Sequence, residues 1–259
     1  MIQLVDDTIA TTPLWLLRPV LLILFMLCCF LGARLRTRFA NARDDHSPDS
    51  YILSAVLGLL GLMIAFTFSM ALNRYDDRRE MVISEANAIG TTWLRAGLIE
   101  GDAGKALQNS IAAYAKLRSH LPVAGETDAV ERYTGEVQRK LWDQMQLSLG
   151  ATPPPIATTL INAMNDMFDI AATRKAEREA QIPVLVVDVV LLYALLSAGI
   201  VGYVLGASEP KHRGVTFILF VLLTLSLSLI LDLDRPWRGG ITISQKPMID
   251  LVEGIGPQT

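Results

Sequence analysis

Bulky apolar side chains recur along one edge of residues 58–73, where they could line a narrow constriction for water or ions. Steps of three and four residues place them on one side of a helix. They are Leu59, Leu62, Phe66 and Met70. Two small residues four positions apart, Gly61 and Ala65, leave a neighbouring side narrow and allow close helix contact in lipid. The pattern fits either an ordinary packed or lipid-facing helix, or an edge that several copies turn toward a common axis.

A single acidic residue, Asp188, stands near the start of another long apolar segment. Ionisable groups within membrane segments are costly, and they are candidates for functions such as proton transfer. A structural role is the alternative, because a carboxylate near a helix end can reach interfacial water or pair with Arg74 or Arg78. The sequence leaves both roles open.

Two acids and an arginine follow the last apolar segment, within the sequence LDLDRPWRGG at 231–240. Asp232, Asp234 and Arg235 could cap a helix, form a network of ion pairs or hold a cation. Hard cations require about six or more oxygen ligands, so two carboxylates favour an ion-paired hinge over a metal site. We therefore predict no bound metal.

No arrangement of residues favours catalysis. The sequence contains no Gly-rich phosphate loop, no GxSxG, no HExxH and no nucleophile beside a plausible base. The three histidines lie in three separate connecting segments, and the only two cysteines, Cys28 and Cys29, are neighbours. A net charge of −3 gives no electrostatic support for nucleic-acid binding. We therefore expect no enzymatic activity, no cofactor and no nucleic-acid partner.

Four long apolar segments position these residues in a lipid bilayer. Of the 259 residues, 51% are hydrophobic, which is typical of an integral membrane protein. Each segment has about the 17–25 residues that cross ~30 Å of hydrocarbon as a helix, and lipid excludes open backbone. The predicted spans are residues 14–33, 51–72, 183–207 and 214–231. The predicted domains are a tail at 1–13, a transmembrane hairpin at 14–72, a helical extramembrane domain at 73–182, a second transmembrane hairpin at 183–233 and a tail at 234–259.

The second span has no turn signal at its end, so it is predicted to continue as a helix into a charged segment. Residues 51–95 would form an unbroken helix about 67 Å long, at 1.5 Å per residue. Beyond the span, its apolar positions form one stripe. They are Tyr75, Val82, Ala86, Ile89 and Trp93. Further helices are predicted at 105–119, 131–149 and 156–181, the last after three consecutive prolines. The predicted fold is an all-α integral membrane protein.

The run GLMIAFTFSMALNRYDDRRE at 61–80 resembles the second span of bestrophins and its exit. The likeness is closer to bacterial bestrophin-like membrane proteins, and it extends to further stretches of the chain. These stretches are EANAIGTTWLR, LDLDRPWRG and ISQKPMIDL. The order of two spans, a long insert and two more spans also agrees. The resemblance therefore implies a bestrophin-like architecture.

The resemblance implies a homo-oligomer, pentameric as in bestrophins, whose second span faces a central pore for small inorganic ions. It puts Leu62 and Phe66 on neck positions and Gly58 where a third bulky residue would stand, so the neck is shorter or its register differs. The residues of the pore exit and its polar network are Met70, Asn73, Arg74, Tyr75, Asp76 and Arg78. Anion conduction is also implied, but arginines and acids alternate at this exit, and counting them leaves the sign of the ion open.

The same resemblance implies a multi-pass protein of the bacterial inner (plasma) membrane, with the long insert and both termini in the cytosol. Counts of arginine and lysine near the span ends do not decide the orientation. Bestrophins carry consecutive aspartates after the fourth span as a calcium clasp. Only Asp232 and Asp234 stand in that region here, so we do not predict calcium gating.

An oligomeric ion channel is the leading hypothesis, because an apolar edge and a continuous exit helix suit a pore. A non-conducting membrane scaffold or sensor of the same architecture is the first alternative, and its axis would be plugged. An intramembrane enzyme or proton-coupled carrier centred on Asp188 is the second.

Overall fold

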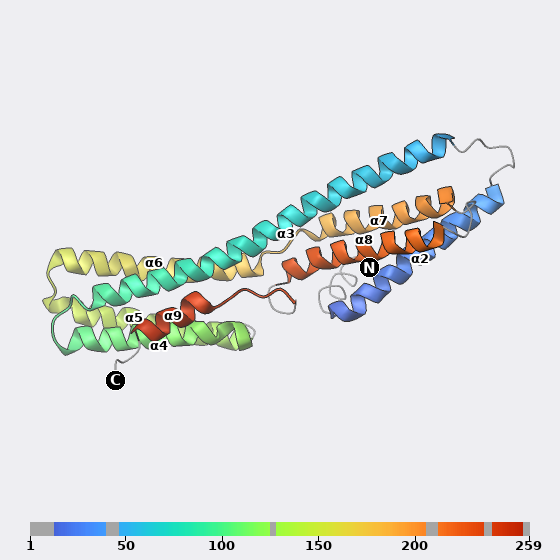
Figure 1. The fold of residues 1–259 in the computed structure, drawn as a ribbon. Coiled ribbons are helices and arrows are strands. Elements are labelled where there is room, and N and C mark those ends of the chain that lie inside the picture. Colours follow the sequence, from blue (N-terminus) through green and yellow to red (C-terminus); the bar gives the residue numbers. More distant parts are fainter. Residues whose placement is uncertain (1–12, 40–46, 125–127, 206–211, 236–239, 256–259) are drawn as a thin grey trace. The chain divides into compact units, whose positions relative to one another are not determined.

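Helices account for all regular structure in the residues that the computed structural model describes, which are 13–39, 47–124, 128–205, 212–235 and 240–255 (Figure 1). In chain order they are α2 (Leu14–Phe39), α3 (Ser47–Ala96), α4 (Asp102–Ala124), α5 (Asp128–Ser148), the short 3-10 helix η1 (Leu149–Ala151), α6 (Pro154–Glu179), α7 (Val184–Leu205), α8 (His212–Asp234) and α9 (Lys246–Ile255). The predicted all-α fold is confirmed. Helix α3 runs for 50 residues, from a strongly apolar half into a charged half.

Four stretches of the described chain are helical, long and apolar enough to cross a membrane, as the hydropathy of the sequence predicts. They are Trp15–Arg38, Tyr51–Ala96, Pro154–Leu205 and Gly214–Asp234. The third stretch comprises α6 and α7, and the strongly apolar sequence in it belongs to α7.

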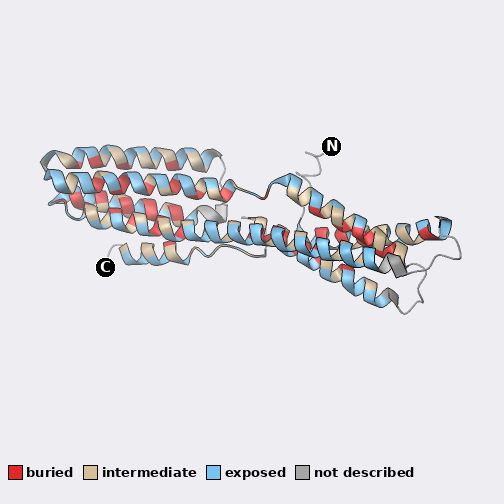
Figure 2. Cartoon of the chain, turned by 90° about the horizontal axis from the view of Figure 1, so that it is seen from above, coloured by how far each residue is buried: buried red, intermediate tan, exposed pale blue. Residues whose placement is uncertain are grey.

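The chain forms two compact units. The apolar unit comprises residues 1–74 and 181–241, with α2, α7, α8 and the first half of α3. The polar unit comprises residues 75–180 and 242–259, with α4, α5, α6, α9 and the second half of α3. Each unit has its own set of buried residues, drawn in red in Figure 2.

Close contact between helices holds the apolar unit together. The buried rings of Phe25 in α2 and Phe220 in α8 stack with their centroids 6.0 Å apart. A Cβ atom added to Gly202 of α7 would lie 1.9 Å from the carbonyl oxygen of Cys29, and one added to Gly32 of α2 would lie 1.9 Å from a carbonyl oxygen of α7. These glycines let the backbones of α2 and α7 touch, which is the usual way that helices associate in lipid.

Replacing Gly202 by alanine is expected to destabilise the apolar unit, because the new methyl group would overlap the backbone of α2. Overpacking of this kind costs about 1–3 kcal/mol, and here the obstructing atoms are backbone, which cannot rotate away. Thermal unfolding in detergent would measure the loss. Gly214→Ala is the matched control, because a Cβ atom there meets nothing within 4 Å. Equal unfolding temperatures for both variants would contradict the close crossing of α2 and α7.

The polar unit buries one apolar core that receives side chains from all five of its long helices. The largest fully buried members are Ile89, Leu107, Ile111, Tyr114, Leu141, Met145, Leu160, Met164, Met167 and Met248. The stripe predicted on this half of α3 faces the core, since Val82, Ala86 and Ile89 are buried and Trp93 packs against the cluster. The polar unit is therefore stabilised by the burial of apolar side chains.

Several helices differ in their bounds from the sequence-based expectation, and α4, for example, spans Asp102–Ala124 instead of 105–119. Helix α6 begins at Pro154 rather than at residue 156, because proline is tolerated in the first turn of a helix, where the backbone N–H has no intrahelical partner. The segment assigned to a C-terminal tail contains helix α9, whose Met248 is fully buried in the core of the polar unit. The spacing of its apolar residues is helical. They are Met248, Leu251, Val252 and Ile255.

Candidate functional site

The face of α3 that carries the predicted neck is exposed. A line of exposed residues, the exposed face of α3, runs through Gly58, Leu62, Phe66, Ser69 and Asn73 at steps of three and four residues. Neighbouring positions such as Leu59, Ala65 and Met70 are exposed as well. The side chain of Phe66 is 65% exposed and that of Leu62 is 50% exposed. The opposite side of the same helix is buried, through Leu60, Thr67 and Ala71. The chain thus packs one side of α3 internally and leaves the side with Phe66 uncovered.

Along the chain, the exposed face of α3 changes from apolar to polar. Phe66 is followed by the hydroxyl of Ser69 and then by the amide of Asn73, both exposed. Asn73 follows the predicted span directly, so its amide suits contact with water.

The residues predicted at the pore exit divide into three groups by burial. Met70, Asn73 and Asp76 are exposed, whereas Arg74 and Tyr75 are half-buried. The sixth, Arg78, is buried: its Nε donates to the carbonyl oxygen of Glu177 at 3.2 Å and its Nη2 to that of Ala180 at 2.5 Å. These carbonyls lie at the C-terminal end of α6, where helix carbonyls lack intrahelical partners and favour a positive charge. Arg78 therefore caps a helix.

Asp188 lies near the start of α7 and is half-buried. The predicted role of Asp188 as an intramembrane acid stays a prediction without further support.

The acids after the fourth span bind backbone amides. Asp232 accepts a hydrogen bond from the amide of Gly240 at 2.7 Å, and Asp234 accepts one from the amide of Ile182 at 2.9 Å. The third residue of this group, Arg235, is buried. In the described part of the chain, no group of three or more His, Cys, Asp and Glu side chains could hold a metal ion. Both of these contacts of the acids are hydrogen bonds to backbone, and the ion-paired hinge stays a prediction.

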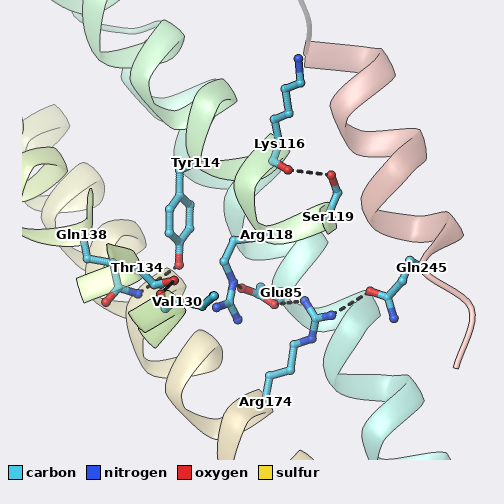
Figure 3. A network of polar contacts seen from close by, with 10 residues as sticks. All are labelled: Glu85, Tyr114, Lys116, Arg118, Ser119, Val130, Thr134, Gln138, Arg174 and Gln245. Atoms are coloured by element: carbon cyan, nitrogen blue, oxygen red, sulfur yellow. Dashed lines mark hydrogen bonds and ion pairs between the residues drawn. The ribbon is translucent and has the colours of Figure 1, made fainter. Parts of the chain in front are cut away.

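A buried charge network in the polar unit was missed by the sequence analysis (Figure 3). The carboxylate of Glu85 in α3, which is 0% exposed, accepts hydrogen bonds from Arg118 in α4 at 2.5 Å and from Arg174 in α6. Arg174 also donates from Nη2 to the Oε1 atom of Gln245 at 2.8 Å. Glu85 therefore joins three helices and, through Gln245, the segment that precedes α9.

A tyrosine lies close to this network. Burial raises the pKa of the Tyr114 hydroxyl to about 12, with the neighbouring charges of Arg118 and Glu85 acting in opposite directions. The phenol therefore keeps its proton at neutral pH, and its oxygen accepts a hydrogen bond from Gln138 at 3.0 Å.

A signal for this network was present in the sequence. Glu85 stands three residues after Val82 and four before Ile89, so it falls on the buried stripe of α3. Arg118 and Arg174 likewise follow the apolar stripes of α4 and α6. An acid at a core position requires a cationic partner, because a buried unpaired charge is very costly. Which arginines supply it depends on the packing of three helices.

A hollow of about 320 Å³, lined by both polar and apolar side chains, opens within the polar unit between α3 and α6. Its lining includes Ser84, Asn87 and Thr91 of α3 and Asp166 of α6. Arg95 borders it and donates to the carbonyl oxygen of Thr159 at 2.8 Å. The hollow continues the polar, exposed side of α3 toward the C-terminal end of that helix.

A family model described as a bestrophin-like domain matches residues 20–248 of the chain. No curated protein matches it.

Solved structures of a bacterial bestrophin homologue from Klebsiella pneumoniae share the fold. One variant of that homologue has a TM-score of 0.70 at 12% sequence identity, covering 91% of this chain and 96% of the other. A second variant has a TM-score of 0.71 at 13% identity, covering 94% and 96%. A further structure of the homologue has a TM-score of 0.66 at 12% identity, covering 93% and 95%.

Proposed function

Because this chain belongs to the bestrophin-like family, we propose that it forms a homo-oligomeric ion channel in which α3 of every copy faces a common axis. Leu62 and Phe66 form the apolar neck in this proposal, and Gly58 lies one turn before Leu62. Met70, Asn73 and Asp76 follow as the pore exit. Five copies surround the axis, the protein lies in the bacterial inner membrane, and the polar unit is cytoplasmic.

One observation carries the proposal: α3 leaves bulky apolar side chains uncovered on the side opposite its packed side. Phe66 is more exposed than any other large apolar side chain of α3 between residues 53 and 93. The same exposed face then becomes polar at Ser69 and Asn73. Beyond a neck, a water-filled pathway would hydrate these polar groups.

The neck acts by excluding water. An ion that passes an apolar constriction must lose part of its hydration shell, so bulky side chains at one level oppose conduction most strongly there. The glycine at position 58 contributes no side chain, and a Cβ atom there would meet nothing within 4 Å. The resistance to ion passage is therefore assigned to Leu62 and Phe66.

The purified protein, reconstituted into planar bilayers, is expected to conduct ions in discrete single-channel steps. Its oligomeric state in detergent should be measured on the same preparation, because a monomer has no shared axis. A folded oligomer that carries no current would contradict the channel and favour the non-conducting scaffold or sensor. A folded monomer would contradict both the pore and the shared neck.

A further inference from the structure

An apolar hollow of about 220 Å³ lies within the apolar unit, between α3, α7 and α8. Leu60, Ala198 and Phe220 form part of its wall and are almost fully buried, with exposures of 4%, 1% and 1%. Gly61 and Leu222 also line the hollow and are exposed, so it opens at the surface of the unit. The three helices therefore enclose a space that their own side chains leave unfilled.

This hollow lies at the depth of the hydrocarbon. Its lining residues Gly61, Ser197 and Leu222 stand within about two residues of the middle of their predicted spans. Gly61 keeps the space open, because a Cβ atom there would meet nothing within 4 Å, whereas one at Gly202 would overlap the backbone of α2. The apolar unit is therefore packed tightly between α2 and α7 and loosely at Gly61.

The chemistry of the lining selects an apolar occupant. The hydroxyl of Ser197 donates to the carbonyl oxygen of Tyr193 at 2.8 Å, and that of Ser226 donates to the carbonyl oxygen of Leu222 at 3.0 Å. Both hydroxyl protons are thus used within their own helices, and the other side chains of the described lining are apolar. A buried water needs two to four polar partners, while apolar cavities of about 150 Å³ stay dry and bind apolar molecules.

The size of the hollow selects a narrow occupant. One turn of an α-helix with its side chains, 5.4 Å long and about 10 Å wide, fills about 400 Å³. A helix of a second copy is therefore too large to enter a space of about 220 Å³. An empty hollow loses the dispersion contacts of its walls, and a flexible chain of methylene groups can follow an irregular space and restore them.

From its depth, lining and size, we propose that the hollow binds one acyl chain of a membrane phospholipid, between Gly61 of α3, Ser197 of α7 and Ser226 of α8. The four long apolar helices place the unit in a bilayer, which supplies such chains at the depth where the hollow opens. This lipid site belongs to the apolar unit alone and does not depend on ion conduction.

A phosphatidylcholine with a photoreactive diazirine in the middle of one acyl chain tests the proposal on the full chain in nanodiscs. After irradiation, mass spectrometry of the peptides should find the label on lining residues of all three helices. Gly61→Leu and Ser226→Phe fill the hollow from two different helices, so each is expected to lower this labelling severalfold. If one of these variants fails to fold, the other retains the test.

Gly214→Leu is the matched control, because Gly214 is exposed, lies outside the lining and has nothing within 4 Å of an added Cβ atom. Its labelling of the hollow should equal that of the unchanged protein. Leu192 of α7, which is 58% exposed and outside the lining, reports contact with bulk lipid and should be labelled equally in every variant.

Labelling of the hollow that neither filling variant lowers would overturn the proposal, because the label would then come from bulk lipid. Labelling in a monomer fraction that is absent from the oligomer of the same preparation would overturn it as well. In that case side chains of a second copy, rather than an acyl chain, would cover the hollow.

Discussion

Phe66→Ala is expected to raise the single-channel conductance severalfold, because it removes the bulkiest exposed side chain of the proposed neck from every copy at once. A wider, wetter constriction lets ions keep more of their hydration shell, which lowers the barrier that an apolar neck imposes. The ring of Phe66 is 65% exposed, so its loss should leave the internal packing of the chain unchanged. Single-channel recording in planar bilayers measures the effect, and thermal unfolding of the same preparation checks the fold.

The matched control for this prediction is Phe217→Ala. Phe217 is also an exposed phenylalanine of the apolar unit, but it lies on α8. Its loss removes the same apolar area without touching α3, so the conductance should not change. If both variants conducted as the unchanged protein does, α3 would not line the pathway, and the neck assignment would have to be abandoned.

Glu85→Gln is expected to cause the largest loss of stability. The substitution leaves the guanidinium groups of Arg118 and Arg174 buried beside a neutral amide, with side-chain exposures of only 4% and 5%. Breaking a buried ion pair by removal of one partner costs about 3–5 kcal/mol, which is a large part of the stability of a typical domain. Thermal unfolding in detergent should show a strongly lowered transition, or the variant should fail to accumulate as a folded oligomer.

A surface ion pair in the same unit provides the control for Glu85. Lys175 and Glu131 lie 2.7 Å apart and are both partly exposed. Because exposed pairs are worth about 0–1 kcal/mol, Glu131→Gln should change the unfolding temperature little. Similar stability of the Glu85 and Glu131 variants would show that the buried network is dispensable.

The Glu85 network also connects the C-terminal segment to the polar unit. Gln245 bonds to Arg174, and three residues later Met248 enters the core. Gly90 of α3 makes room for this segment, since a Cβ atom there would approach Leu251 to 3.1 Å. The loss of Glu85 is therefore expected to loosen α9 as well as α3, α4 and α6.

The sequence by itself determined the helical fold, the four spans and the uninterrupted α3, because these properties depend on residues close together along the chain. Apolar length selects a spanning helix, and the absence of turn signals after Leu72 lets α3 continue. The stripe from Val82 to Ile89 also predicted which side of α3 faces the core of the polar unit. The start of α6 differed by two residues, since prolines fit a first helical turn.

Only the tertiary structure decided which charged side chains are buried and which are exposed. Arg78 and Glu80 are two residues apart, yet one caps the end of α6 and the other stays exposed. Glu85 finds its arginines 33 and 89 residues further along the chain. The spacing of residues along the sequence predicts on which side of a helix a side chain lies. Its partner on that side belongs to another helix, distant in sequence. The free energy of a buried charge depends on that partner, so it is decided when the helices pack.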